Sequence, residues 1–135
     1  MIDINNLNDR QKEAVLTTDG PLLILAGAGS GKTKVLTTRI AYLIEEKNVS
    51  PYNILAITFT NKAAKEMQSR VVNLVGEYAK NMQVSSVHSF GLRLLRENYD
   101  KLGYDKNFVI MDSDDSLTVV KKRKYWANRI IYELY

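Results

Sequence analysis

The sequence predicts an α/β fold in which helices flank a parallel sheet, and three observations point to it. Short apolar runs alternate along the chain with longer stretches whose apolar residues recur at helical spacing. Turn-forming residues such as Asp19, Gly20 and Pro21 separate the two kinds of segment. Residues 22–25 form a continuous apolar run, as expected of a strand buried on both faces. Alternating strands and helices are typical of parallel strands joined by right-handed crossovers.

The first two helices are predicted from a capping signal and an apolar stripe. Asn8 or Asp9 is a suitable N-cap for a helix that extends to about Thr17. A longer helix is expected from Gly31 to about Lys47. Its predicted inward stripe consists of Val35, Leu36, Ile40, Leu43 and Ile44.

Two further strand–helix units, a fourth strand and a last helix are expected in the rest of the chain. The strands are predicted at residues 54–59, 84–87 and 108–111. A helix capped by Thr60 should begin near Asn61, another should follow residue 87, and the last should begin at Ser113. The residues predicted to face inward are Ala64, Met67, Val71, Leu74 and Val75 in the helix after Thr60, and Phe90, Leu94 and Leu95 in the next one.

Composition is that of a folded chain with one ordinary domain. It has 135 residues, of which 45% are hydrophobic and 25% charged. The absence of cysteine excludes disulfides and thiolate metal sites and fits a reducing, cytoplasmic location. The N-terminus lacks the features of a secretory signal, and the longest apolar run is far shorter than the ~20 residues of a membrane span. The net charge of +4 permits a polyanionic partner without requiring one.

Eight residues between the first predicted strand and the second helix match the phosphate-binding loop of nucleotide-binding proteins. They are Ala26, Gly27, Ala28, Gly29, Ser30, Gly31, Lys32 and Thr33, with alanine where the first glycine usually stands. Glycines let backbone N–H groups turn toward a phosphate, and the helix that follows adds the positive end of its dipole. The expected catalytic residues are Lys32, which reaches the β- and γ-phosphate oxygens, and Thr33, whose hydroxyl ligates Mg²⁺. The loop therefore predicts binding of ATP with Mg²⁺.

The segments around this loop resemble the superfamily 1 DNA helicases of the UvrD/PcrA/Rep type. The resemblance rests on residues 7–15 and the loop, then on residues 57–67 and 87–96, and it continues through residues 108–115. It implies an incomplete RecA-like P-loop NTPase domain that uses ATP and Mg²⁺. It also implies 3′-to-5′ movement along single-stranded DNA, coupled to unwinding of the duplex. Gln11 matches the glutamine that reads adenine in this family, although taken alone it would be read as a solvated helix residue.

The resemblance also implies DNA contacts in two short motifs. Phe59, Thr60 and Asn61 match the first single-strand motif, in which Thr60 would bind a phosphate and Phe59 would stack on a base. The pattern alone favours a core position for Phe59, at the end of a strand. Residues 86–89, which include His88 and Ser89, resemble the next motif, in which Val87 replaces an aromatic residue that family members commonly carry. A lone histidine such as His88 also suits a helix cap or a core position.

Parts of a complete motor are expected to lie beyond residue 135. Residues 1–112 are assigned to the N-terminal part of a first RecA-like ATP-binding domain, and residues 113–135 to the start of a helical inserted subdomain or to a non-native tail. Hydrolysis needs a metal-binding carboxylate, a base and an arginine, so the isolated chain is expected to be inactive. Asp112 is the one local candidate for that carboxylate, and with Ser113 it also suits the N-cap of the last helix.

Two other functions stay open on the sequence. The chain could be a stand-alone nucleotide-binding module, or a small phosphate-loop enzyme such as a kinase that uses Asp112 on the metal. A GTPase is not supported, because Ala64 stands where the guanine-reading acid would be. The implied partners are single-stranded DNA and the remainder of a helicase chain, with no membrane. Self-association is also expected, either through the edge at residues 22–25, which a sheet lacking a neighbouring strand would expose, or through the aromatic-rich helix at the end of the chain.

Overall fold

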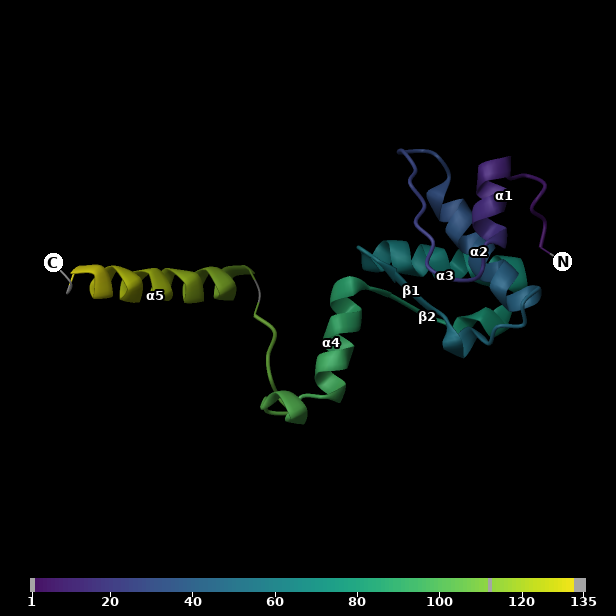
Figure 1. Cartoon of the computed structure of the whole chain (residues 1–135). Helices are drawn as coiled ribbons and strands as arrows, with labels where there is room; N and C mark the ends of the chain where they lie inside the picture. Colours follow the sequence, from purple (N-terminus) through teal and green to yellow (C-terminus); the bar gives the residue numbers. More distant parts are fainter. Residues whose placement is uncertain (1, 112, 133–135) are drawn as a thin grey trace. The chain divides into compact units, whose positions relative to one another are not determined.

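A computed structural model describes residues 2–111 and 113–132, with side chains described up to residue 123. The chain divides into two compact units, Met1–Leu95 and Arg96–Tyr135. The first unit contains the helices α1 (Asp9–Leu16), α2 (Lys32–Glu45) and α3 (Asn61–Val75), the strands β1 (Leu55–Thr58) and β2 (Gln83–Ser86), and most of α4 (Val87–Glu97) (Figure 1). Short 3-10 turns lie at Pro51–Asn53 and Glu77–Asn81. The second unit contains a 3-10 turn at Asp100–Leu102 and the helix α5 (Ser113–Tyr132).

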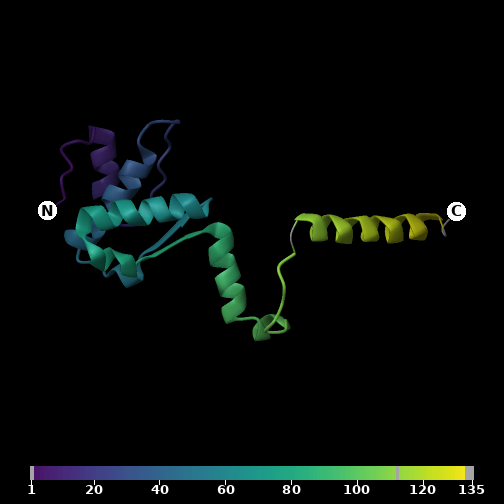
Figure 2. The ribbon, with the colours of Figure 1, turned by 180° about the vertical axis from the view of Figure 1, so that it is seen from behind.

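The sheet of the described residues has two parallel strands. Leu55 pairs with Gln83 and Thr58 with Ser86, so the carboxyl ends of both strands lie at the same edge. Helix α3 connects them and packs against both strands. Seen from behind, α3 passes in front of the strands (Figure 2). The predicted strand–helix–strand alternation of this region is therefore confirmed, and residues 61 and 87, which begin α3 and α4, come together at one edge.

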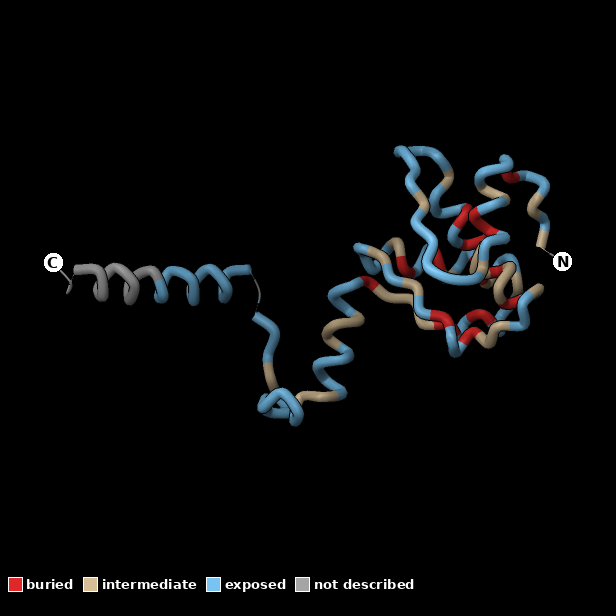
Figure 3. The backbone as a smooth tube through the Cα atoms, in the orientation of Figure 1, coloured by how far each residue is buried: buried red, intermediate tan, exposed pale blue. Residues whose placement is uncertain are grey.

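The core consists of two clusters that meet helix α2 from different sides. One contains Val15 of α1 and Val35 of α2, with Leu7 and Ala14 beside them. The other joins Ile44 of α2 to Val71 of α3, with Ile54, Ala79 and Met82. Buried segments are coloured red in Figure 3, where they gather between α1, α2 and α3 and near the start of the two strands.

Local capping residues define where the helices begin. Asn8 Oδ1 accepts the backbone N–H of Gln11 at 2.9 Å, while Gln11 Oε1 accepts that of Asn8 at 3.0 Å, which completes a capping box. Thr60 caps α3 by accepting the N–H of Ala63 at 3.1 Å. Gly76, with a φ of 89°, follows the end of α3. The predicted caps Asn8 and Thr60 are thus confirmed.

Two predicted strands are wrong. Residues 22–25 are irregular, with Leu25 87% accessible and Ile24 half-buried against the cluster that contains Val15, and residues 108–111 are likewise irregular, with Val109 85% accessible. Both segments have the composition of a buried strand, but a strand also needs a neighbouring backbone. In the described sheet β1 and β2 pair only with each other, and the backbone hydrogen bond within residues 20–30 joins Ser30 to Gly27. The self-association predicted at residues 22–25 therefore lacks its strand edge and stays a prediction.

Some residues predicted to face inward are exposed instead. The buried stripe of α2 follows Val35, Thr38, Ala41 and Ile44, which leaves Leu36 outside. Residue 87 starts a helix rather than ending a strand, and α4 buries none of its residues. The other exposed members of the predicted inward sets are Leu74, Leu94 and Leu95.

The C-terminal helix begins at Ser113 as predicted. Asp112, its predicted capping partner and the candidate metal carboxylate, lies outside the described residues, as does the end of the predicted tail. The expected domain boundary at residue 112 stays a prediction. Within residues 2–111 and 113–132, no helix has the length and apolar character needed to cross a membrane.

Truncation of Val71 should weaken the fold measurably. Val71 is fully buried in the cluster that joins α2 to α3, so Val71→Ala loses the transfer free energy of two carbons and leaves a cavity. We expect the free energy of unfolding to fall by about 1.5–3 kcal/mol in urea denaturation. The matched control is Val87→Ala, because Val87 is half-exposed on α4. Equal losses for the two variants would contradict this description of the core.

Candidate functional site

The phosphate-loop segment, residues 26–33, connects the irregular run at residues 22–25 to the first turn of α2. Gly29 and Gly31 both adopt the left-handed conformation, with φ of 73° and 83°. Gly31 is also the N-cap of α2. Because residues with a Cβ rarely adopt this conformation, these two glycines determine the shape of the turn. The left-handed Gly31 places Lys32 and Thr33 as the first two residues of the helix.

The Lys32 side chain folds back over its own loop. Its Nζ donates to the carbonyl oxygens of Ala26 at 3.1 Å and Gly27 at 2.5 Å. The Ser30 hydroxyl donates to the same Gly27 oxygen at 2.8 Å. The loop therefore carries a positive charge at its centre, next to the positive end of the α2 dipole. Such an arrangement attracts an anion, and phosphate most of all.

The rest of the loop is open to solvent. A Cβ built on Gly27 or Gly29 would meet no heavy atom within 4 Å, and Ala28 between them is exposed. Thr33 is exposed in the first turn of α2, beside Lys32. The predicted loop residues therefore form one accessible surface at a helix N-terminus.

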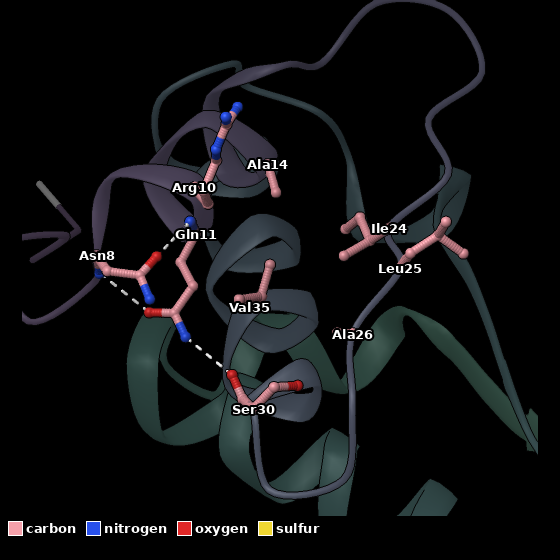
Figure 4. A pocket seen from close by; sticks show the side chains of 9 residues that line it. All are labelled: Asn8, Arg10, Gln11, Ala14, Ile24, Leu25, Ala26, Ser30 and Val35. Atoms are coloured by element: carbon pink, nitrogen blue, oxygen red, sulfur yellow. Dashed lines mark hydrogen bonds between the residues drawn. The ribbon is translucent and has the colours of Figure 1, made fainter.

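Gln11 connects helix α1 to this loop. Its Nε2 donates to the Ser30 carbonyl at 3.0 Å, while its Oε1 is held by the Asn8 backbone N–H. The contact is close enough that a Cβ on Gly31 would lie 3.1 Å from Gln11 Nε2. Gln11 is therefore not a simple solvated helix residue. It lines a cavity of about 220 Å³ between α1, residues 24–26 and the start of α2 (Figure 4).

Arg39 fixes the other end of α1, a contact that the sequence did not predict. Its guanidinium Nη1 donates to the Ala14 carbonyl at 2.6 Å and to the Thr17 carbonyl. These oxygens lie at the C-terminal end of α1, where a helix has unpaired carbonyls and the negative end of its dipole. Helix α1 is thus held at both ends, by Gln11 at the loop and by Arg39 on α2.

A second group of predicted residues lies at the carboxyl end of β1. The Phe59 side chain is 91% exposed, so the alternative of a core position is wrong. Thr58 Oγ1 donates to the Thr60 carbonyl at 2.9 Å. The Thr60 hydroxyl is used as the cap of α3. An accessible aromatic ring therefore stands directly before a capped helix N-terminus.

Helix α4 begins beside α3. The Asn61 and Ser89 side chains, which belong to the two predicted DNA motifs, are in contact, with Ser89 Oγ 2.8 Å from Asn61 Oδ1. Ser86, which begins the second of these motifs and had no contact assigned to it, has its Oγ 2.6 Å from Asn61 Oδ1 and 2.9 Å from Ser89 Oγ. His88 is exposed in the first turn of α4, so a core position is wrong for it. The structure thus brings the two predicted motifs together.

No group of three or more histidine, aspartate or glutamate side chains in the described part of the chain is arranged to hold a metal ion. The Thr33 hydroxyl is the hard oxygen donor nearest to Lys32 in sequence, and such oxygens suit Mg²⁺.

Comparison with known proteins decides the family. Residues 7–132 match the model of the UvrD/REP helicase N-terminal domain. The chain belongs to this family. The match includes the phosphate loop, Gln11 and both motifs at the ends of β1 and β2, and it agrees with the resemblance predicted from the sequence.

Individual relatives are highly similar over most of the chain. The ATP-dependent DNA helicase PcrA of Staphylococcus epidermidis is 61% identical over 118 residues, and the protein of the same name from Staphylococcus aureus is 58% identical. The alignment covers 87% of this chain in both cases. The chain spans 16% of the length of these curated relatives.

Two variants of Gln11 should separate its two contacts. Gln11→Ala removes both, whereas Gln11→Glu keeps an oxygen for the Asn8 N–H and loses the donor to the Ser30 carbonyl. We expect the Ser30 amide to exchange its hydrogen faster in both variants, because the loop loses its anchor. The Asn8 amide should exchange faster only in Gln11→Ala. Unchanged exchange at Ser30 in Gln11→Glu would show that Gln11 does not hold the loop.

Proposed function

We propose that this chain is the ATP-binding N-terminal part of a DNA helicase that moves 3′ to 5′ along single-stranded DNA and unwinds duplexes. The observation that carries the proposal is the phosphate loop, with Lys32 folded into it and Gln11 anchored to it from α1. Membership of the UvrD/REP family and similarity to ATP-dependent DNA helicases support the same activity. The direction of movement rests on the resemblance alone, and a cytoplasmic location rests on the absence of cysteine.

ATP binding is assigned to the loop and the cavity beside it. The ATP-binding residues are Gln11, Ala26, Gly27, Ala28, Gly29, Ser30, Gly31, Lys32 and Thr33. The phosphates would lie over the backbone N–H groups of the loop. The Lys32 ammonium, which donates to loop carbonyl oxygens in this structure, would then bind phosphate oxygens instead. The adenine would enter the cavity lined by Gln11, and the amide edge of Gln11 retains one N–H for it. A parallel RecA-like sheet is proposed as the scaffold.

Thr33 would be the chain's ligand for Mg²⁺, with Lys32 beside it for the phosphates. The metal, when bound, neutralises charge on the phosphate oxygens. Lys32 adds a second positive charge at the same group and orients it. Hydrolysis also needs a base and an arginine, to which no residue of this chain is assigned, so we propose nucleotide binding without turnover for the 135 residues alone.

The DNA strand is assigned to the residues at the carboxyl ends of β1 and β2. Phe59 offers an exposed ring on which a base can stack. Thr60, Asn61, His88 and Ser89 lie at the N-termini of α3 and α4, where helix dipoles favour a phosphate. Single-stranded DNA and the remainder of a helicase chain are therefore the proposed partners.

Loss of the Lys32 charge should abolish nucleotide binding. Because the ammonium would contact two phosphate groups, Lys32→Ala should weaken ATP–Mg²⁺ affinity by about a hundredfold in isothermal titration calorimetry. The matched control is Lys65→Ala, an exposed lysine of α3 that should change affinity less than about twofold. Release of inorganic phosphate should not be detectable for the parent chain. Steady turnover without DNA would instead favour a small phosphate-loop enzyme.

Removal of the Phe59 ring should weaken single-strand binding. Stacking of one base contributes about 1–3 kcal/mol, so Phe59→Ala should lower affinity for labelled oligothymidylate about five- to one-hundredfold in fluorescence anisotropy. Tyr52 is another exposed aromatic residue, and it precedes the amino end of β1, whereas Phe59 follows the carboxyl end. Tyr52→Ala is therefore the matched control. If both variants bind like the parent chain, the assignment of the strand to this edge fails.

A further inference from the structure

Three side chains from three elements form one hydrogen-bonded cluster at the edge where β1 and β2 end. Ser86 ends β2, Asn61 begins α3, and Ser89 lies in the first turn of α4. Ser86 Oγ is 2.6 Å from Asn61 Oδ1 and 2.9 Å from Ser89 Oγ, and Ser89 Oγ is 2.8 Å from Asn61 Oδ1. We refer to these three residues as the Ser86 cluster. It ties together segments 25 and 28 residues apart in sequence.

Ser86 is the member of the cluster that is shielded from water. Its relative accessibility is 4%, whereas Asn61 and Ser89 are exposed. A buried hydroxyl without a partner costs about 1–3 kcal/mol, so Ser86 depends on these contacts. Its oxygen also accepts the Ser89 backbone N–H at 3.3 Å, which makes it the side-chain cap of α4. One hydroxyl thus contacts the first turns of both helices.

The cluster also determines how Asn61 is presented. A carbonyl oxygen has two lone pairs, so Oδ1 can accept the single hydrogen of each serine hydroxyl, and the 2.9 Å contact between the two hydroxyl oxygens then carries no hydrogen. The amide plane of Asn61 is then fixed, with Nδ2 directed away from the cluster. Asn61 is exposed, and Nδ2 has no hydrogen bond among the contacts of the described residues. Its two N–H groups are therefore available to an acceptor such as a phosphate oxygen.

We propose that Ser86 is a positioning residue for the strand site, a role that rests on the proposed DNA-binding function. Ser86 does not touch DNA. It holds the N-termini of α3 and α4 together and orients the Asn61 amide, so that the two motifs bind one strand as a rigid unit. Ser89, expected from the resemblance to contact DNA, acts within the cluster by holding the same Asn61 oxygen.

The strand affinity of Ser86→Ala tests this role. We expect binding of labelled oligothymidylate by the 135-residue chain to weaken about five- to tenfold. Ser85→Ala is the matched control, since Ser85 precedes Ser86 on the same strand and its buried hydroxyl has no partner among the described residues. Ser85→Ala should bind like the parent chain. Ser89→Ala, at an exposed position, removes one of the two donors to Asn61 and should weaken binding in the same direction without endangering the fold.

A double-mutant cycle separates positioning from simple support of the helix. If Ser86 acts through Asn61, Ser86→Ala should cause no further loss of strand affinity in an Asn61→Ala background. A cap that only stabilises α4 would cause the same loss in both backgrounds. Asn61→Asp keeps an oxygen for both hydroxyls but replaces the amide donors with a negative charge. It should therefore lose strand affinity while its urea midpoint stays near that of the parent.

These experiments distinguish a failure of the positioning role of Ser86 from a failure of the proposed DNA binding. If the parent chain binds the oligonucleotide, Phe59→Ala weakens binding and Ser86→Ala matches Ser85→Ala, the positioning role alone is overturned. An additive cycle overturns it as well. If the parent chain does not bind the oligonucleotide, the strand assignment and the positioning role fall together.

Discussion

The packing of helix α2 between α1 and α3 is the constraint on which the rest of the first unit depends. Val35, one turn after the phosphate loop, packs with Val15 of α1, and Ile44 near the other end packs with Val71 of α3. The contacts that fix α1 therefore also locate the loop at the start of α2. Because α3 carries Asn61 at its first residue, the strand site is attached to the same core. Buried apolar contacts therefore connect the two halves of the candidate site.

The sequence predicted the helices better than the strands, for a physical reason. A helix forms its hydrogen bonds within itself, so caps such as Asn8 and Thr60 and the apolar spacing locate it from local information. A strand needs a partner, and an apolar run such as residues 22–25 says nothing about whether a neighbouring backbone is present. β1 and β2, which overlap the strands predicted at residues 54–59 and 84–87, form because α3 brings them beside each other. The same limit applies to the apolar face of a helix. The spacing in α4 predicted which residues share a face, but it could not predict whether another element covers that face, and α4 buries none of its residues.

The residues of the candidate site likewise include some that the sequence predicts and some that it does not. The sequence predicted the two glycines at positions 29 and 31 and the lysine that follows them. These residues belong to the loop, and its turn and its charge depend on residue types at fixed neighbouring positions. Ser86 and Arg39 were not, because each acts on a carbonyl group 25 residues away in sequence. Their roles depend on which elements become neighbours. A buried serine at a strand end and an arginine on a helix have no distinctive pattern of their own.

The connection between α1 and α2 is long and largely exposed, so it is the place where the chain is most easily cut. Non-covalent contacts hold together the two helices that it joins. Irregular, accessible segments such as residues 22–30 are where proteases cut most readily, and Leu23 and Leu25 offer accessible side chains there. A cut would leave α1 without a covalent bond to α2. Val15 would still pack against α2, Arg39 would still hold the last turn of α1, and Gln11 would still bond to Ser30. The nicked protein would then be two peptides that behave as one folded body, with Gln11 joining them across the cut.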